Sequence, residues 1–274
     1  MSVQRMLAAF LIAMPMAVLA SSFECLIEPS QVVEIRASVD GVIAVVKARR
    51  GELLRKGQVL VELESDAERV AVESAGYRAR MEGQLATART RVDYATTKLN
   101  RVLDLERKQY LAQQARDDAK AELHLAENEL LAALESRELA KIEFRRAQEQ
   151  LALRTLASPF DGVVVDRMLN PGDLAEPGNG RKAVLKIAQI NPLKVDVVMP
   201  AALFGQVKAA QRANVVTAVG GKQYAASVDI VDRVIDAASG TFVVRLGLPN
   251  PDMTVPIGSR CTAEFDDISI TGQP

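Results

Sequence analysis

The proline-free stretch from Asp66 to Thr155 constrains the fold of this chain more than any other feature. Its only glycines are Gly76 and Gly83, and it is dominated by alanine, leucine, glutamate, glutamine, lysine and arginine, which are strong helix formers. Apolar residues recur at steps of three and four in both halves, at Leu85, Ala88, Val92, Ala95, Leu99 and Val102, and at Leu123, Ala126, Leu130, Ala133, Ala140, Phe144, Ala147 and Leu151.

This spacing predicts a long antiparallel α-helical coiled-coil hairpin over residues 66–155. The two helices would meet near Lys108–Gln113, and each would run for about 40 residues, or about 60 Å. Arg137 interrupts the apolar seam of the second helix. Alanine at alternate seam positions lets the two backbones approach closely, so we expect a narrow spike with much polar surface.

Short β-strands are predicted on both sides of this hairpin. Residues 32–65 contain strand-like runs separated by turn residues, and residues 156–190 repeat the same pattern of strands and turns. The second copy, with Asp161-Gly162-Val163 and Pro171-Gly172-Asp173, matches Asp40-Gly41-Val42 and Arg50-Gly51-Glu52 of the first. A repeat of about 35 residues cannot bury a core alone, so the two copies are expected to pack together as one split β-domain.

The last third of the chain, residues 191–265, is again rich in β-branched residues. Five strands and one short helix at Ala201–Ala209 are expected there, the strands at Leu193–Met199, Asn214–Val219, Ser227–Val234, Thr241–Leu246 and Arg260–Phe265. This set suits a small, closed or nearly closed β-barrel. The fold class is therefore α+β, with residues 266–274 as a short C-terminal tail.

The N-terminus reads as an export signal. Arg5 is followed by the apolar run Met6–Ala20, and small residues at Val18 and Ala20 favour removal of residues 1–20 as a signal peptide. A retained membrane anchor is an alternative, although the run is shorter than the ~20 residues that a spanning helix needs. A lipoprotein is a third reading, because Cys25 follows closely, but the residues before that cysteine fit poorly.

Two cysteines lie near the two ends of the mature chain, Cys25 in the N-terminal segment 21–31 and Cys261 in the last predicted strand. An exported chain meets an oxidising compartment, where a bond between them would join the two ends and place residues 21–31 against the barrel. Two independent buried thiols are the alternative.

The composition argues against chemistry at a catalytic centre. The chain has one histidine, two cysteines and no tryptophan, and His124 lies in a run with the composition of a solvated helix, so no catalytic, cofactor or metal residues are predicted. The formal net charge of −1 gives no indication of nucleic acid as a partner.

The order of these motifs resembles the periplasmic adaptor, or membrane-fusion, family that serves resistance-nodulation-division and related export pumps. The matching segments are Ala37–Ile43, Gly51–Leu60, Ser158–Val164, Asn170–Asp173, Val228–Val234, Thr241–Arg245 and Pro249–Asp252. The resemblance implies an elongated modular adaptor, in which a split lipoyl-like domain carries the hairpin and precedes the barrel. It also implies a location in the periplasm, associated with the inner membrane.

Partners follow from the same resemblance. Adaptors of this family bridge an inner-membrane transporter and an outer-membrane channel as a homo-oligomeric ring, a hexamer by resemblance. The family's channel contact has arginine, leucine four residues on, and serine seven further. Arg101 and Leu105 match this pattern, whereas Ala112 stands in place of the serine. These three residues are the predicted docking site at the hairpin tip.

Two other classes of protein compete with this interpretation. Lipoyl and biotinyl carriers share the repeated β-fold but hold their cofactor on a lysine between the halves. The corresponding junction here, Glu62–Asp66, contains no lysine. A structural coiled-coil protein of the envelope is the second alternative, but it requires neither an export signal nor two β-modules at one end of the spike.

Overall fold

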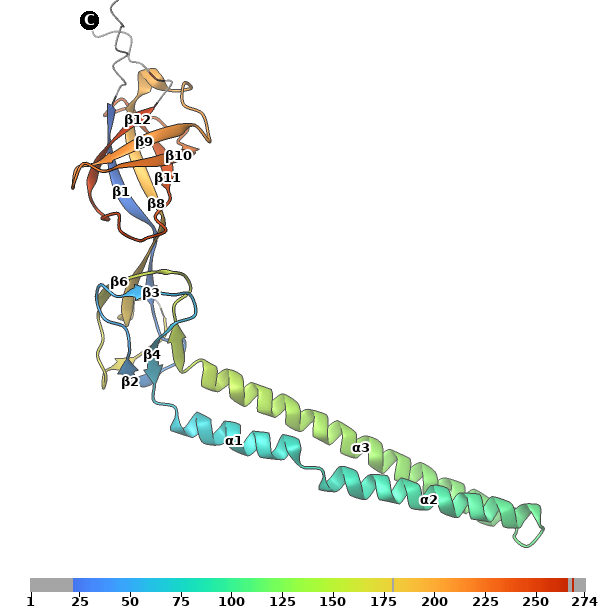
Figure 1. The fold of residues 1–274 in the computed structure, drawn as a ribbon. Helices are drawn as coiled ribbons and strands as arrows, with labels where there is room; N and C mark the ends of the chain where they lie inside the picture. The colour runs from blue at the N-terminus through green and yellow to red at the C-terminus, as the bar shows by residue number, and fades with distance from the viewer. Residues whose placement is uncertain (1–21, 179, 266–267, 269–274) are drawn as a thin grey trace, which may run out of the picture.

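The structure is a computed structural model that describes residues 22–178, 180–265 and 268. The molecule is elongated, with a β-barrel at one end, a smaller β-domain next to it, and two antiparallel helical arms projecting from the smaller domain (Figure 1). This arrangement confirms the mixed α+β class. The expected signal peptide at 1–20 and nearly all of the expected tail at 266–274 lie outside the described residues.

Six strands form the barrel in the order β1-β12-β9-β10-β11-β8, and pairing of β1 with β8 closes it. Their bounds are β1 Ser22–Ile35, β8 Leu185–Pro200, β9 Arg212–Thr217, β10 Gln223–Val231, β11 Thr241–Leu248 and β12 Arg260–Phe265. The interior is apolar and includes the fully buried side chains of Ile27, Leu193, Met199, Leu246, Phe242 and Phe265. The short helix expected at Ala201–Ala209 is wrong in length, because only a 3-10 turn, η1 at Ala201–Leu203, forms there.

The smaller domain is assembled from both sides of the helical arms. Its strands are β2 Gly41–Val46, β3 Leu53–Leu54 and β4 Val59–Leu63 from the first copy of the repeat, with β5 Thr155–Ala157, β6 Gly162–Arg167 and β7 Leu174–Ala175 from the second. Pairings β2–β7, β3–β6 and β4–β5 join the two copies. The repeated turns exchange equivalent hydrogen bonds, because the Gly51 N–H donates to the Val164 carbonyl (2.8 Å) and the Gly172 N–H to the Ile43 carbonyl (2.8 Å).

Strands β1 and β8 run through both β-domains and pair with each other in both. The sequence suggested that the smaller domain ends near residue 190 and that a separate strand begins at Leu193. In the structure β8 is a single strand of 16 residues across this point. The register of β1 shifts between Pro29 and Gln31, next to the junction, and the Ser30 hydroxyl donates to the Pro192 carbonyl (2.8 Å).

Three helices make up the two arms: α1 Asp66–Arg80, α2 Gly83–Arg107 and α3 Gln113–Ala152. The outgoing arm is therefore interrupted, which corrects the expected single helix of about 40 residues. Met81 has extended backbone angles (φ −63°, ψ 126°), and Arg137 lies opposite with its guanidinium 3.0 Å from Glu82. A guanidinium at a seam position cannot pack like an alanine, and Gly83 has low helix propensity, so the arm breaks where Arg137 must be accommodated.

Candidate partner-docking site

The tip of the hairpin is a short turn between the end of α2 at Arg107 and the start of α3 at Gln113. Arg101 and Leu105 lie one helical turn apart and share one face of α2; Arg101 is exposed and Leu105 is half-buried. Ala112 is exposed and caps the start of α3 with an extended backbone (φ −74°, ψ 154°). The structure places all three predicted residues at or near the tip, Arg101 and Leu105 on α2 and Ala112 in the turn immediately before α3.

Local contacts order this turn. The Tyr110 N–H donates to the Leu105 carbonyl (3.0 Å), and Gln109 adopts a left-handed backbone with φ 62°. Arg116, in the first turn of α3, binds Glu106 across the tip (3.2 Å). These contacts involve both helices and fix the conformation of the turn.

The most exposed apolar side chains of the tip are not among the three predicted docking residues. Tyr110 is 75% exposed, and Leu111 beside it is also exposed. Turns at helix ends are usually polar, so a tyrosine and a leucine in this turn were the available signal. Together with Leu105 they give the tip an apolar contact surface.

Small side chains and ion pairs hold the two arms of the hairpin together between its base and its tip. Ala88, Ala95 and Ala126 are buried between the arms. Lys98 binds Glu122 of the opposite arm (2.5 Å), and this hydrogen bond raises the pKa of Lys98. Near the base, a Cβ atom at Gly76 would lie 2.9 Å from a ring carbon of Phe144, so glycine is the residue that admits this ring between the arms.

A second surface lies on the barrel, at the other end of the molecule. An open groove of about 550 Å³ lies over β1, β8 and β12, and its lining residues are Glu24, Cys25, Leu26, Glu28, Asp196, Val198, Ala218, Arg260, Cys261 and Thr262. Asp196 also accepts two hydrogen bonds from Arg245, at 2.8 and 3.1 Å, and this contact raises the pKa of Arg245. The groove therefore combines exposed apolar side chains with several carboxylates.

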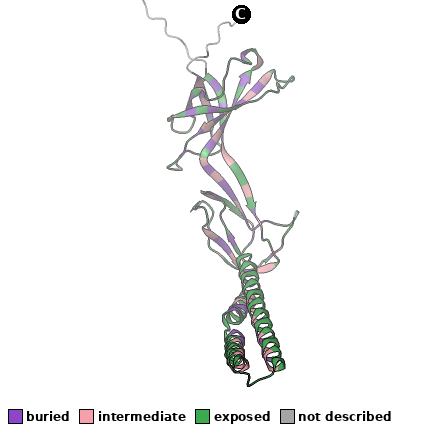
Figure 2. Cartoon of the chain, turned by 90° about the vertical axis from the view of Figure 1, so that its right-hand side faces the viewer, coloured by how far each residue is buried: buried purple, intermediate pink, exposed green. Residues whose placement is uncertain are grey.

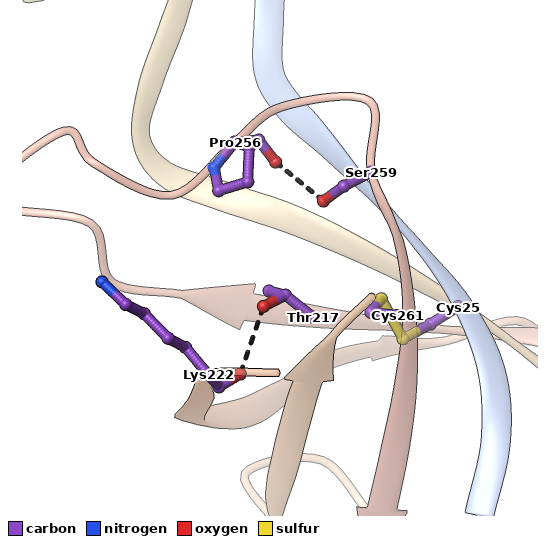
Figure 3. The surroundings of a disulfide bond; sticks show 6 residues. All are labelled: Cys25, Thr217, Lys222, Pro256, Ser259 and Cys261. Atoms are coloured by element: carbon purple, nitrogen blue, oxygen red, sulfur yellow. Dashed lines mark hydrogen bonds between the residues drawn. A yellow bond between two sulfur atoms is a disulfide. The ribbon is translucent and has the colours of Figure 1, made fainter. Parts of the chain in front are cut away.

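Cys25 and Cys261 face each other across the pairing of β1 with β12 and are joined by a disulfide, with Cα atoms 4.8 Å apart (Figure 3). Both cysteines are buried. Hydrogen bonds order the adjacent loops, where the Ser259 hydroxyl donates to the Pro256 carbonyl (2.9 Å) and the Thr217 hydroxyl to the Lys222 carbonyl (3.3 Å). The bond would close a loop with a sequence separation of 236 residues.

We expect this disulfide to form in the exported protein. Mass spectrometry of unreduced, alkylated protein should give an intact mass without added alkyl groups and a linked peptide pair containing Cys25 and Cys261. Replacing both cysteines by alanine should lower the free energy of unfolding by about 2–4 kcal/mol, because the unfolded chain is no longer constrained. Two alkylated cysteines in protein isolated from an oxidising compartment would contradict the prediction.

No group of three or more histidine, cysteine, aspartate or glutamate side chains among residues 22–178, 180–265 and 268 is arranged to hold a metal ion. His124 lies on the outer surface of α3, 3.1 Å from Glu127 in the next turn. In the same part of the chain, no helix has the length and apolar character needed to cross a membrane.

A barrel, a second β-domain made from two copies of a repeat, and an inserted pair of helical arms are the parts that the resemblance to membrane-fusion proteins led us to expect. No family model matches the chain. It is 24% identical over 250 residues to the multidrug efflux pump subunit AcrA of Escherichia coli K12, covering 86% of this chain and 59% of that protein. It is 25% identical over 252 residues to the multidrug resistance protein MdtE of the same strain, covering 87% and 62%.

Solved structures show the same fold. MacA from Actinobacillus actinomycetemcomitans matches with a TM-score of 0.72 and 22% identity, over 89% of this chain and 78% of MacA. The membrane fusion protein Spr0693 from Streptococcus pneumoniae R6 matches with a TM-score of 0.59 and 16% identity, over 91% and 100%. These findings confirm the resemblance to the periplasmic adaptor family. The chain spans about 60% of the length of the two curated relatives.

Proposed function

We propose that this chain is the periplasmic adaptor subunit of a tripartite efflux or secretion system and bridges an inner-membrane transporter to an outer-membrane channel. The observation that carries the proposal is the separation of two candidate contact surfaces, the hairpin tip and the barrel groove, by a 40-residue helix that spans about 60 Å (Figure 1). Similarity to subunits named for multidrug efflux and resistance supports it. The role is one of binding and positioning, without catalysis or a cofactor.

The two ends of the molecule have different partners in this proposal. The tip, with Arg101, Leu105 and Ala112 and with the exposed Tyr110, docks against the outer-membrane channel. The barrel groove around Leu26 faces the inner-membrane transporter. Tyrosine at the tip offers the kind of anchor that dominates binding energy at protein interfaces, whereas contacts at the rim of an interface contribute less.

Several copies assemble side by side into a ring, a hexamer by resemblance, whose arms form a tube of two-helix coiled coils around the export path. The smaller domain corresponds to the lipoyl-like domain of the family. It sets the angle between the helical arms and the barrel. After removal of residues 1–20 the chain is periplasmic and associated with the inner membrane through its transporter. The hairpin is then long enough to hold the tip, which docks with the channel, away from the inner membrane.

Affinity purification from detergent-solubilised envelopes tests this function. A tagged chain expressed at its natural level, after reversible cross-linking in cells, should recover one inner-membrane transporter and one outer-membrane channel. A variant in which residues 91–97 and 123–129 are deleted together removes a matched heptad from both arms and shortens the hairpin by about 10 Å. It should retain the transporter and lose the channel. Recovery of neither protein with the unmodified chain would contradict the adaptor role.

A further inference from the structure

A cavity lies between the arms at the place where the outgoing arm is interrupted. Most residues of the arms are exposed (Figure 2), but around the gap between Arg80, which ends α1, and Gly83, which starts α2, the arms surround a small space. On the opposite arm, α3 lines this space with the small side chains of Ala133, Ser136 and Ala140. The cavity has a volume of about 290 Å³, near the lower end of the range for ligand pockets in proteins. Its size therefore suits a small ligand.

Two arginines place positive charge at this cavity. Arg78 of α1 and Arg137 of α3 both line it, and among the described residues of its wall Glu143 carries the only negative charge. Glu143 lies 3.6 Å from Arg78, a distance at which the two charges attract each other without forming a strong hydrogen bond. Glu82, which binds Arg137 at 3.0 Å, has a side chain that is 71% exposed. Both guanidiniums are therefore able to bind a further anion.

One N–H group of Arg137 has no acceptor. Its Nε atom is buried and makes no hydrogen bond within the part of the chain that the structure describes, whereas Nη2 of the same guanidinium donates to Glu82. A buried donor without an acceptor is destabilising, and folded proteins rarely leave one unsatisfied. An oxygen atom beside Nε would satisfy this donor, and an anionic oxygen would form the stronger, charge-assisted hydrogen bond.

Apolar side chains form another part of the wall. Leu85 is buried, whereas Met81 is 56% exposed and Leu139 is 59% exposed, although both line the cavity. Apolar surface that faces water is unfavourable, and a hydrocarbon group in the cavity would cover part of it. A ligand that combines an anionic group with a hydrocarbon body therefore matches both kinds of wall.

An open groove of about 520 Å³ continues from the cavity toward the tip. Gln84, Ala133 and Ser136 line both the cavity and the groove. The groove ends near Arg91 and Glu129, which pair across the arms. Glu129 lies about 12 Å from Arg137 along α3, so the groove gives room for an alkyl chain of medium length.

We propose that the cavity binds a small anionic amphiphile, a carboxylate or phosphate monoester with an alkyl chain of medium length. Its anionic group accepts the hydrogen bond of Arg137 Nε and is attracted by Arg78. Its chain covers Met81, Leu85 and Leu139 and extends into the groove. The ligand then contacts all three helices and fixes the angle between α1 and α2. This site goes beyond the bridging role, because it requires neither the transporter nor the channel.

Isothermal titration calorimetry of the full mature chain tests the site with three probes that share one alkyl chain. Octanoate carries a carboxylate, octyl phosphate carries a phosphate and octylamine carries a positive charge. Below the concentration at which micelles form, we expect at least one of the two anions to bind once per chain and octylamine not to bind. The anion with the higher affinity identifies the head group, a free carboxylic acid or a phosphate ester.

Variants locate the binding. Arg137→Met keeps a long side chain in the seam and removes the guanidinium, so it should weaken binding of the anion at least about tenfold. Ala140→Leu leaves both arginines in place and fills the cavity, and it should weaken binding to a similar extent. The matched control is Arg145→Met, which removes an exposed arginine of α3 that does not line the cavity, and its affinity should equal that of the unmodified chain.

Three results would overturn this inference. The first is that neither octanoate nor octyl phosphate binds, which would mean that water alone fills the cavity. The second is equal binding of octylamine, which would show that the alkyl chain binds without regard to charge. The third is unchanged affinity for the anion in Arg137→Met or in Ala140→Leu. Circular dichroism checks that each variant keeps its helices, and if Arg137→Met loses them, Ala140→Leu decides the third result.

Discussion

Leu105→Asp should reduce export to the level seen without the protein. Leu105 is half-buried beside the exposed apolar turn at Tyr110 and Leu111, and docking would bury these side chains against the channel. Loss of an interface anchor commonly costs about 2 kcal/mol or more, which weakens binding about 30-fold, and burying a carboxylate there adds to the cost. Export of a pump substrate from cells that carry the variant as their only copy is the measurement.

Two further variants separate docking from folding. Leu134→Asp makes the same substitution at an exposed leucine in the middle of α3, away from the buried seam and the tip, and should export normally. Tyr110→Ala removes an almost fully exposed ring, so it should leave helicity and thermal stability unchanged and still weaken export. Normal export by both Leu105→Asp and Tyr110→Ala would show that the tip is not the docking element.

Gly162→Ala should strongly destabilise the smaller β-domain. A Cβ atom at this position would lie 2.2 Å from the carbonyl oxygen of Ala188, which is backbone of β8 and is held there by pairing with Val163. The strand cannot move aside without losing that pairing, so we expect a loss of about 2–4 kcal/mol in the free energy of unfolding. Urea denaturation followed by circular dichroism and by protection from proteolysis measures it.

Gly41→Ala is the matched control, because Gly41 occupies the equivalent place in the other copy of the repeat. Its Cβ would meet the end of the Arg154 side chain at 2.6 Å, and that guanidinium can move. The cost should be about 1 kcal/mol, for the hydrogen bond between Arg154 and the Asp40 carbonyl (2.8 Å). Equal effects of the two substitutions would show that the contact at Ala188 is not what requires glycine.

After the proline-free helical stretch, the internal repeat was the most informative part of the sequence for the fold. Its glycine-containing turns recur with the same neighbours, and this symmetry reappears in the paired hydrogen bonds of Gly51 and Gly172. Helix-forming composition without proline likewise predicted the arms. Both signals are local, and local patterns are what a single sequence expresses most directly.

Features that depend on contacts between distant segments were predicted less well. The sequence showed Arg137 interrupting a seam, but where its guanidinium would bind, and that the opposite arm would break at Met81, depends on packing across the arms. The sequence suggested a boundary near residue 190 and a new strand from Leu193, yet β8 is continuous there because β1 pairs with it on both sides of this point. At the tip, matching residue types predicted a docking site but did not include Tyr110, because the exposure of Tyr110 depends on the shape of the turn.

The passage of β1 and β8 through both β-domains has a mechanical consequence. The chain crosses between barrel and smaller domain on these two hydrogen-bonded strands, so the crossing is a paired ribbon that bends less easily than a single-chain linker would. The hydrogen bonds between β1 and β8 are perpendicular to the strands. A force along the strand axis therefore acts on all of these bonds at once and does not break them one after another. Two paired strands therefore couple the barrel mechanically to the smaller domain that carries the helical arms.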